Sequence, residues 1–519
     1  MDKLQPESIE WSLTHITRFG DTDLFPVPFE FEAIKHSWGN LKTAIADIDL
    51  ETYEVRPFQR ILVPKQDGCY RVAIQLDPID TIIYTALAYE AAGLIEKIRV
   101  PIEEKVACSY RVSLDSNGEL FRKNNGWDDY HSKSQELANS GLYKLVVTAD
   151  IADFFNQIGH HRVRNSLENA GVREERAKNI ENLLLNFTKG QSQGIPIGPS
   201  ASSLFAEACL SDVDSFLIRK NYVHTRYVDD FRIFCTDRSQ AQRAMHSLTE
   251  YLYTAHRLAL QSHKTKVWEI SEFIEKELID PEELENESQE ELLDSLQSII
   301  SIYADEEFMD EPDLSELVRN NLVDLFDSCL FSEPIHLGTA KYLLRRATAL
   351  RTGVLRTTVL SNVEKLAPAM REVAHYLIAT TKTEFAASIG LDLIKGCKSS
   401  SYEFLPYVRL WLLNVLQKKM SNSLESEIAD LCGEYATVLG RRPYALLARE
   451  KNYIDWVREQ KETVLNNTPW DRRAIIWSAK ALSGDELMYW LKRVQNAGDL
   501  LDKAIAQAVL NLKQNESGQ

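Results

Sequence analysis

The sequence predicts an α+β domain followed by an all-α, HEAT-like helical-repeat domain. Short β-type runs such as RILVPK (60–65) and KLVVTAD (144–150) alternate with helical stretches only up to about residue 270. From about residue 331 onward, amphipathic segments of roughly 12–25 residues follow one another with short breaks, as in stacked helical pairs. No residue motif repeats cleanly there, so a compact irregular helical bundle is the alternative.

An acidic stretch separates the two domains. Residues 271–330 contain 20 Asp and Glu against only Lys276 and Arg319, a local net charge of −18. The whole chain also carries −18, so the remainder is neutral and a basic groove elsewhere is not excluded. We therefore predict three regions: 1–270, an acidic linker or helical connector over 271–330, and 331–519. A solvated face or linker is the simplest interpretation of such a charge run.

The composition is typical of a soluble protein with more than one domain. The chain has 519 residues, and 44% of them are hydrophobic. Its start, MDKLQPESIE, lacks the apolar core of a signal peptide, and the stretch FLPYVRLWLLNVLQ is interrupted by Arg409 and too short to span a bilayer. Seven cysteines without a CxxC pair indicate free thiols. We predict a cytoplasmic protein that does not bind membranes.

Two adjacent aspartates stand out in RYVDDFRIF (226–234), where Asp229 and Asp230 lie between apolar runs. VHTRY, VDD and FRIFC predict strand, tight turn and strand, which places both carboxylates at a hairpin tip. Asp150 ends another buried strand, KLVVTAD. Because like charges repel, these positions need a neutralising partner, and a pair of Mg²⁺ ions with hard oxygen ligands would provide it. A turn that happens to contain two aspartates is the alternative.

Four blocks in order resemble the reverse-transcriptase family over roughly residues 55–270. TADIADFF carries Asp150 and, five residues later, the aromatic Phe155. QGIPIGPS (193–200) resembles the second block, YVDD (227–230) the third and LALQSHKTKV (258–267) the fourth. The resemblance implies a right-hand polymerase fold with palm and fingers, and the activity of a nucleotidyltransferase that is an RNA-directed or a terminal-transferase-like DNA polymerase.

Further segments resemble the bacterial defence-associated, unknown-group reverse transcriptases, and within them the abortive-infection (Abi) branch. The usual LPQG reads SQG here, and the acidic stretch replaces the hydrophobic thumb expected after Thr265. This resemblance implies template-independent, protein-primed DNA synthesis in antiphage abortive infection, and a homo-oligomer. The segments that carry it are DTDLFPVPFEFEAI (21–34), RILVPKQDGCYRVAIQLDPID (60–80), ACSYRVSLDSNGELF (107–121) and PWDRRAIIW (469–477).

The resemblance implies that Asp150, Asp229 and Asp230 are the catalytic residues. Together with Ile151 they are the predicted ligands of two Mg²⁺ ions, for which Mn²⁺ could substitute. Asp230 would either bind a metal ion directly or orient its neighbour. A purely structural role of the aspartates is the alternative.

Three residues of the first two blocks are predicted to contact an incoming deoxynucleoside triphosphate. Phe155 would pack against the sugar and exclude a 2′-hydroxyl, as the resemblance implies. Gln193 would hydrogen-bond the sugar or base, and Gly194 would permit a close backbone approach. The alternatives are a core phenylalanine and an ordinary Gly/Pro turn.

Three cations are also predicted to bind the nucleotide. Lys65 and Arg71 flank the turn QDGCY of a fingers hairpin and would contact the triphosphate. Lys264, in the fourth block, would protonate the leaving pyrophosphate. Solvated hairpin charges and a surface lysine are the alternatives.

Basic residues of the C-terminal region could line a groove for single-stranded DNA product, with Trp470 and Trp477 available for base stacking. Arginines whose stems cover apolar helix surface are the more ordinary explanation. The groove candidates are Arg345, Arg346, Arg472 and Arg473.

Two other functions stay open. One is a conventional RNA-templated reverse transcriptase in a defence system, and the other is a catalytically inactive scaffold that binds a partner through its helical repeats. The predicted partners are deoxynucleoside triphosphates and a DNA product that could be covalently attached, and RNA is left open. No pattern among the 20 tyrosines or the serines marks a priming hydroxyl.

Overall fold

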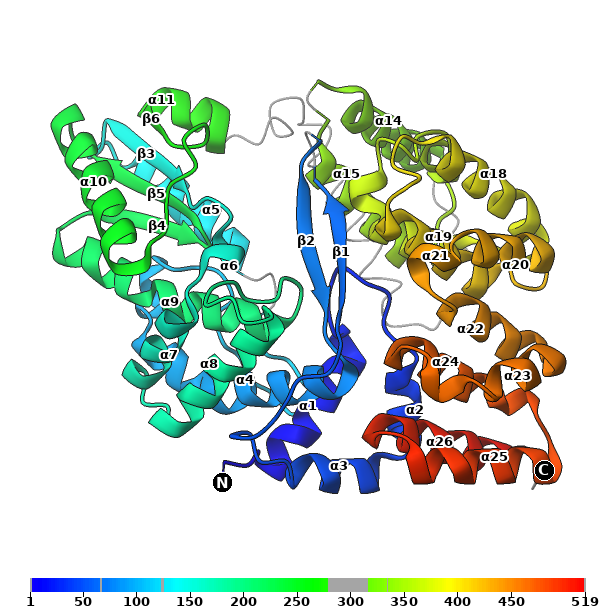
Figure 1. The fold of residues 1–519 in the computed structure, drawn as a ribbon. Helices are drawn as coiled ribbons and strands as arrows, with labels where there is room; N and C mark the ends of the chain where they lie inside the picture. Colours follow the sequence, from blue (N-terminus) through cyan, green and yellow to red (C-terminus); the bar gives the residue numbers. More distant parts are fainter. Residues whose placement is uncertain (1, 66–67, 123–125, 279–315, 334, 518–519) are drawn as a thin grey trace. The chain divides into compact units, whose positions relative to one another are not determined.

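A computed structural model describes residues 2–65, 68–122, 126–278, 316–333 and 335–517. The described residues divide into two compact units, each considered by itself, and Figure 1 colours them along the chain. Most of the predicted acidic connector, residues 279–315, lies outside the described residues. Unit 1 falls within Met1–Asp23, Lys42–Gln59 and Ile74–Glu285, and unit 2 within Leu24–Leu41, Arg60–Ala73 and Asn286–Gln519.

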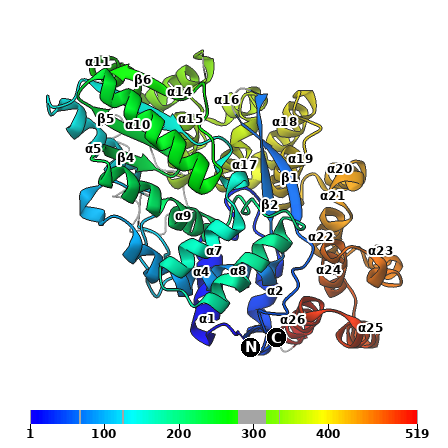
Figure 2. The same cartoon turned by 60° about the vertical axis from the view of Figure 1, so that its left-hand side comes forward.

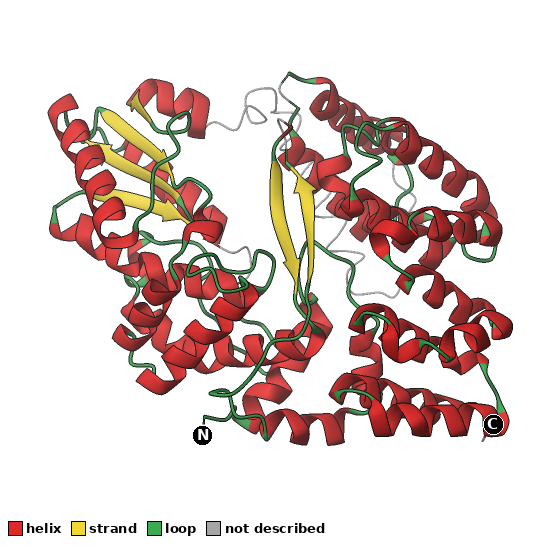
Figure 3. Ribbon diagram, viewed as in Figure 1, coloured by secondary structure: helices red, strands yellow, loops and turns green. Residues whose placement is uncertain are grey.

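Unit 1 contains a four-stranded antiparallel sheet in the order β4-β5-β3-β6. Its strands are β3 (Leu145–Asp150), β4 (Val223–Tyr227), β5 (Asp230–Cys235) and β6 (Lys266–Glu269), drawn in yellow in Figure 3. Every residue of β3 except the terminal Asp150 is buried, and β5 is likewise buried after Asp230. The runs that contain Asp150 and follow Asp229 therefore form the two central strands, β3 and β5, and VHTRY forms the edge strand β4.

Helices cover this sheet and build the rest of unit 1. Helix α10 contacts β3 and β5, whereas α5 contacts β4 and β5, and Figure 2 shows α10 lying across the strands. The bounds are α1 (Pro6–Phe19), α4 (Pro78–Ile98), η2 (Ile102–Glu104), α5 (Trp127–Asn139), α6 (Phe154–Gln157), α7 (His160–Asn169), α8 (Glu174–Phe187), α9 (Ser200–Arg219), α10 (Arg238–Tyr251), η4 (Leu252–His256), α11 (Ile270–Phe273) and η5 (Ile274–Leu278).

Helix α4 illustrates how the sequence defines these elements. Asp77 is its N-cap and accepts a hydrogen bond from the Ile79 main-chain N–H at 3.0 Å, while Pro78 begins the helix where no N–H is needed. Fourteen of its 21 residues are buried, because TIIYTALAYEAAGLIEKI is apolar on nearly every side. The helix contacts both α1 and α9 and forms the centre of the helical part of unit 1.

The described C-terminal part of unit 2 is all-helical. Helices two apart in the chain contact each other in the series α15, α17 and α19 and again in the series α22, α24 and α26, as stacked helical pairs would. HEAT-like repeats stay a prediction. The bounds are α14 (Glu316–Phe331), α15 (Leu337–Ala349), α16 (Arg356–Ser361), η6 (Ala367–Ala369), α17 (Met370–Thr380), η7 (Thr383–Phe385), α18 (Ala386–Ser399), α19 (Pro406–Lys419), α20 (Glu425–Glu434), α21 (Ala436–Leu439), α22 (Arg442–Lys451), α23 (Ile454–Lys461), η8 (Val464–Asn466), α24 (Pro469–Ser478), η9 (Ala479–Ala481), α25 (Gly484–Ala497) and α26 (Leu500–Ser517).

Two N-terminal segments belong to unit 2, although the predicted boundary at residue 270 places them with the first domain. One holds α2 (Glu30–His36), whose His36 carbonyl accepts a hydrogen bond from Asn511 of α26 at 3.0 Å. The other holds most of the β1 (Gln59–Pro64) and β2 (Tyr70–Gln75) hairpin. Helix α3 (Trp38–Ala46) crosses from unit 2 to unit 1. Contacts of long sequence separation therefore define the units, and local patterning does not reveal them.

The hydrophobic core of unit 2 joins these segments to the C-terminal helices. Phe25, Val63 and Ala73 belong to the same cluster of buried residues as the leucines of α15 to α19. Trp411, also buried, donates from its indole Nε1 to the Leu24 carbonyl at 3.3 Å. No helix in the described ranges is both long enough and apolar enough to traverse a bilayer. The seven cysteines are all free, and only Cys69 is exposed.

Candidate active site

The antiparallel pairing of β3 with β5 brings the three predicted catalytic aspartates to one edge of the sheet. Asp150 is the direct cross-strand partner of Asp230 in this register. The main-chain N–H of Ile151 donates to the Asp229 carbonyl at 3.1 Å, which ties the end of β3 to the hairpin tip. Like charges directly opposite each other destabilise a sheet unless something neutralises them. The structure therefore places like charges opposite each other, and these carboxylates need a neutralising partner.

The turn between β4 and β5 is strained. Val228 has φ of +54°, in the left-handed region that a β-branched residue rarely occupies. Such a conformation costs about 1–3 kcal/mol and persists only where surrounding contacts enforce it. Here Val228 donates from its N–H to Ser109 Oγ at 2.8 Å and accepts at its carbonyl from Arg226 Nη1 at 2.8 Å. Side chains from outside the turn thus fix its backbone.

A lysine neutralises the first aspartate. Lys264 Nζ donates to Asp150 Oδ2 at 2.7 Å, and the loop that carries it is anchored by the Gln261 N–H, which donates to the Asp150 carbonyl at 2.7 Å. Burial lowers the pKa of the lysine, but the hydrogen bond and the charge of Asp150 outweigh it, so the pKa of Lys264 is raised. The ammonium group therefore stays charged beside the carboxylates at neutral pH.

Asp230 lies in more protected surroundings. Burial, together with the charges of Asp150 and Asp229, raises the pKa of Asp230 to about 6, although Arg232 and the nearby Tyr130 hydroxyl act in the opposite direction. The Arg232 guanidinium stacks over the Tyr130 ring at 4.2 Å, which keeps both groups next to this carboxylate. Without a bound cation, Asp230 is therefore about half-protonated near pH 6 and ionises as the pH rises further.

The donor chemistry of this edge fits a hard divalent cation. Three carboxylates and the main-chain carbonyl of Ile151 are the oxygen ligands that Mg²⁺ prefers. Across the described part of the chain, however, no three His, Cys, Asp or Glu side chains are grouped closely enough to hold a metal ion. Lys264 engages Asp150 instead. Lys264 bonds only Oδ2 of Asp150, so a cation would use the other oxygen or replace the lysine, and the carboxylates would approach one another around it.

The structure places the residues of the second predicted block next to those that follow Asp150. Phe154 is buried, whereas Phe155 is half-buried and its carbonyl accepts from the Ile195 N–H at 2.9 Å. Gly194 has φ of +96°, and a Cβ there would meet the Asn156 carbonyl oxygen at 3.3 Å. Gln193 is exposed and donates to Gln157 Oε1 at 3.3 Å. Glycine is thus required at residue 194 by backbone geometry, independently of any nucleotide.

Lys65 and Arg71 lie on the β1–β2 hairpin, which belongs to unit 2, whereas the aspartates belong to unit 1. Both side chains are exposed. Lys65 donates from its main-chain N–H to the Cys69 carbonyl at 2.7 Å, which closes the hairpin turn. Their contact with a nucleotide stays a prediction.

The candidate groove residues of unit 2 have mixed surroundings. Arg345 is exposed, and Arg346 stacks over the Tyr342 ring at 4.9 Å. Arg472 instead donates to Asp502 at 2.8 Å and to Asp499 at 3.0 Å, and Arg473 is fully buried. Trp470 and Trp477 are also buried. These positions favour a structural role for the Arg472–Arg473 pair and for both tryptophans over contact with single-stranded DNA.

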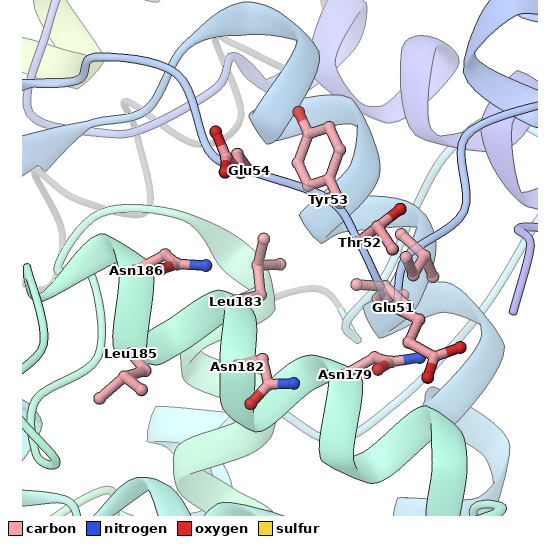
Figure 4. A pocket seen from close by; sticks show the side chains of 11 residues that line it. Glu51, Thr52, Tyr53, Glu54, Asn179, Asn182, Leu183, Leu185 and Asn186 are labelled. Atoms are coloured by element: carbon pink, nitrogen blue, oxygen red, sulfur yellow. The ribbon is translucent and has the colours of Figure 1, made fainter.

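Two of the pockets in the described part of the chain lie on unit 1. One, of about 350 Å³, is lined on one side by asparagines of α8 and on the other by residues 51–54, and Figure 4 shows these side chains. It includes none of the predicted site residues. The second, of about 490 Å³, is bordered by Gln193 and by basic and histidine side chains of α7 and η4. Its Arg162 pairs with Asp212 at 2.8 Å, and its His256 lies 3.0 Å from the same carboxylate.

Sequence reasoning missed the residues that hold the hairpin turn, namely Ser109, Glu207, Asp214 and Arg226. All four are buried, and all four bond to one another or to the turn. One available signal was Arg226, a charged residue inside the otherwise strand-like segment VHTRY. An arginine in a buried strand requires carboxylate partners. The carboxylate partners Asp214 and Glu207 lie 12 and 19 residues before Arg226, whereas Ser109 lies 119 residues before Val228.

Comparison with known proteins supports a polymerase domain in this part of the chain. Residues 63–305 match the family model for "Reverse transcriptase (RNA-dependent DNA polymerase)". This range covers slightly less than half of the chain and contains Asp150, Asp229 and Asp230. No curated protein matches the chain.

Solved telomerase structures are among those similar to the chain. Telomerase from Candida albicans in complex with a TWJ fragment of telomeric RNA is 12% identical, with a TM-score of 0.31 over 74% of this chain and 65% of that one. Apo telomerase from Candida tropicalis is 10% identical, with a TM-score of 0.33 over 77% and 72%. Apo telomerase from Candida tropicalis truncated from its C-terminal domain is 13% identical, with a TM-score of 0.30 over 46% of this chain and 55% of that one. The chain thus spans 65% of the Candida albicans telomerase and 55% of the truncated Candida tropicalis form, and these TM-scores are too low to establish a common fold.

Proposed function

We propose that the chain is a Mg²⁺-dependent DNA polymerase of reverse-transcriptase type, with Asp150, Asp229 and Asp230 as its catalytic residues. The family match over residues 63–305 supports the enzyme class and, with it, binding of nucleotides and nucleic acid. The observation that carries the assignment of residues is the cross-strand pairing of Asp150 with Asp230, next to Asp229 at a strained turn.

Nucleotide addition is an in-line displacement at the α-phosphorus, in which negative charge grows on the attacking and leaving oxygens. Two divalent ions, when bound, supply the positive charge that this step needs. Asp150, Ile151, Asp229 and Asp230 would hold them. Lys264, once released from Asp150, becomes available as a proton donor to the leaving pyrophosphate.

We predict that Phe155→Ala admits ribonucleotides, because the half-buried ring would no longer exclude a 2′-hydroxyl. The ratio of kcat/KM for a deoxynucleotide to that for its ribonucleotide should fall by about 10-fold or more. Phe155→Tyr, which keeps the ring, is the matched control and should retain discrimination. Steady-state incorporation of each nucleotide measures this ratio. An unchanged ratio for Phe155→Ala would remove the proposed role in sugar selection.

We further propose that synthesis is template-independent and primed by a hydroxyl of the protein itself, in antiphage abortive infection. The support is the resemblance of residues 21–34, 60–80, 107–121 and 469–477 to the Abi branch. Unit 2 would guide single-stranded product in place of a thumb. The proposal includes a cytoplasmic homo-oligomer.

One experiment distinguishes the possible activities. The purified full chain is incubated with Mg²⁺ and labelled deoxynucleotides, with and without a primed RNA template, and the products are separated on a denaturing protein gel. Label that migrates with the polypeptide without template supports self-primed synthesis. Label that depends on template and migrates as free nucleic acid identifies a copying enzyme. No label in any lane, matching a reaction with EDTA, rejects the polymerase in favour of a scaffold.

A further inference from the structure

A buried, charge-balanced network lies beside the tip of the β4–β5 hairpin. Two arginines and two carboxylates share it with one serine, and none of them is more than 4% exposed. Three separate segments contribute: the strand β4 itself, the helix α9, and the stretch between α4 and α5. Its members are Arg99, Ser109, Glu207, Asp214 and Arg226. Charges buried to this degree are tolerated only when each is paired and hydrogen-bonded.

Arg226 uses its whole guanidinium in this network. Its Nε and Nη2 donate to the two oxygens of Asp214 at 2.8 Å and 2.6 Å, and Nη2 also donates to Glu207 at 3.0 Å. The remaining nitrogen, Nη1, donates to the Val228 carbonyl at 2.8 Å. The group that balances two carboxylates therefore also fixes the main chain of the turn, and a planar fork is needed to do both.

Ser109 holds the same residue through its other main-chain group. Its Oγ accepts from the Val228 N–H at 2.8 Å and donates to Glu207 in a short hydrogen bond. Arg99 completes this side by donating to Glu207 at 2.8 Å and to the Ser109 carbonyl at 2.7 Å. The N–H and the carbonyl of Val228 are thus both hydrogen-bonded to residues of the network. This double attachment is what a valine with φ of +54° requires, since the left-handed conformation is unfavourable for it in isolation.

We infer that Arg226, Ser109 and Glu207 are positioning residues, which hold Val228 in its left-handed conformation and thereby set where Asp229 and Asp230 present their carboxylates. The expected effect on nucleotide incorporation rests on the proposed function. The expected effect on the affinity of the hairpin tip for a cation does not. Groups that act through a metal ligand typically change metal affinity or activity by about 10–100-fold when they are removed. A role in core stability alone would lower the melting temperature without such a change.

Two variants and one matched control test the inference. Ser109→Ala deletes only the oxygen that bonds Val228, and Arg226→Lys keeps the buried positive charge but loses the fork. Ser12→Ala is the control, because Ser12 is equally buried in unit 1 and its Oγ donates to the Ile9 carbonyl at 2.8 Å within α1. Mn²⁺ binding to the full chain with deoxynucleotide present is measured from the electron paramagnetic resonance signal of free Mn²⁺. Incorporation gives kcat and KM, and circular dichroism gives the melting temperature.

Ser109→Ala should raise the half-saturating Mn²⁺ concentration and lower kcat by about 10-fold each, while KM for the nucleotide stays within about twofold. Arg226→Lys should shift both further, and Ser12→Ala should shift neither. Folded Ser109→Ala with wild-type Mn²⁺ binding and kcat overturns the inference, whether or not Arg226→Lys folds. If wild-type chain binds Mn²⁺ but incorporates nothing, the proposed function fails, and the Mn²⁺ shift in Ser109→Ala still decides the positioning role. Wild-type chain that binds no Mn²⁺ overturns both.

Discussion

Unit 1 buries many charged side chains in its core, whereas unit 2 is held together mainly by apolar packing. Buried charged side chains are numerous in unit 1, and they are few in the described residues of unit 2. Burying an ion pair is often neutral or unfavourable for stability. The many buried charged side chains of unit 1 therefore indicate that they position neighbouring groups rather than stabilise the fold. Unit 1 buries Asp2, Asp21, Asp77, Asp80, Arg99, Arg111, Arg176, Glu207, Asp214, Arg226 and Arg232, and unit 2 buries Glu30, Glu372, Arg473 and Asp502.

The largest expected effect is on catalysis in unit 1. Asp150→Asn and Asp229→Asn should each lower nucleotide incorporation by about 1,000-fold or more, because the amide cannot supply the negative charge that the cations require. Incorporation of labelled deoxynucleotide measures the loss, and circular dichroism verifies folding. Asp47→Asn, at an exposed carboxylate of unit 1 that pairs with Lys3, should retain activity. Substantial activity in folded Asp229→Asn would contradict the catalytic assignment.

In unit 2 the buried ion pair Glu30–Arg442 tests whether residues 24–41 belong to this unit. Arg442 donates to both oxygens of the fully buried Glu30, at 2.6 Å each, and stacks over Phe29 and Trp470. Arg442→Met should cost unit 2 about 3 kcal/mol of unfolding free energy, since it leaves a buried carboxylate unpaired. Chemical denaturation measures this cost.

A double-mutant cycle completes that test. Glu30→Gln together with Arg442→Met removes the charge as well as its partner, so the double variant should be more stable than Arg442→Met alone. Strictly additive losses from the two substitutions would show that the two side chains do not interact, and would remove this pair as evidence that residues 24–41 belong to unit 2.

Apolar packing in unit 2 should behave differently from the charged core of unit 1. Leu412→Ala, at a residue with no exposed surface, should lower the unfolding free energy of unit 2 by about 2–4 kcal/mol. Scanning calorimetry should show the unit 2 transition at a lower temperature while the unit 1 transition is unchanged. Leu391→Ala, at a leucine that is 48% exposed, should change little. A common downward shift of both transitions would show that the units unfold as one.

Local patterning predicted the parts of the site that depend on neighbouring residues. The apolar runs around Asp150 and Asp229 identified two buried strands, and the segment VDD between two strand-like runs identified the turn. The sequence also allowed the prediction that Phe154 and Phe155 differ in burial, because adjacent residues on a short helix face different surroundings. Phe154 is buried and Phe155 is half-buried. These inferences need only the backbone geometry of one element.

Contacts between distant segments could not be predicted in this way. Nothing local in PVPFEFEAI shows that Glu30 pairs with Arg442. Nothing in the segment around Ser109 shows that its hydroxyl bonds the main chain of a turn 119 residues later. The helical pattern of PWDRRAIIW likewise did not show that Arg473 and Trp477 point into the core. Amphipathic periodicity gives the width of an apolar face, but not which charged residues at its border become paired and buried.

The smallest expected effect is a pH dependence that is confined to unit 1. Asp77 and Asp80 are fully buried near the start of α4, and Arg56 lies 4.0 Å from the first and 3.4 Å from the second. Burial and the charge of Asp77 raise the pKa of Asp80 from 3.8 to about 7, against the opposing effects of Arg56 and a hydrogen bond from Tyr53. Because two carboxylates share one arginine, the pair as a whole retains a proton that the unfolded chain would lose.

The sign of the effect follows from that difference. Between about pH 4 and pH 7 the folded chain holds the proton and the unfolded chain does not, so stability falls as the pH rises through this window. Between pH 5 and pH 8 the loss should amount to about 2–3 kcal/mol, because one pKa unit corresponds to about 1.4 kcal/mol. Asp80→Asn removes the titrating group, and the change in unfolding free energy between pH 5 and pH 8 should be smaller by this amount than in wild type. Asp237→Asn, at the exposed N-cap of α10, is the control for a general charge effect. Equal pH dependence in wild type and Asp80→Asn would mean that the pair is ionised throughout, and that unit 1 stabilises its buried carboxylates by pairing alone.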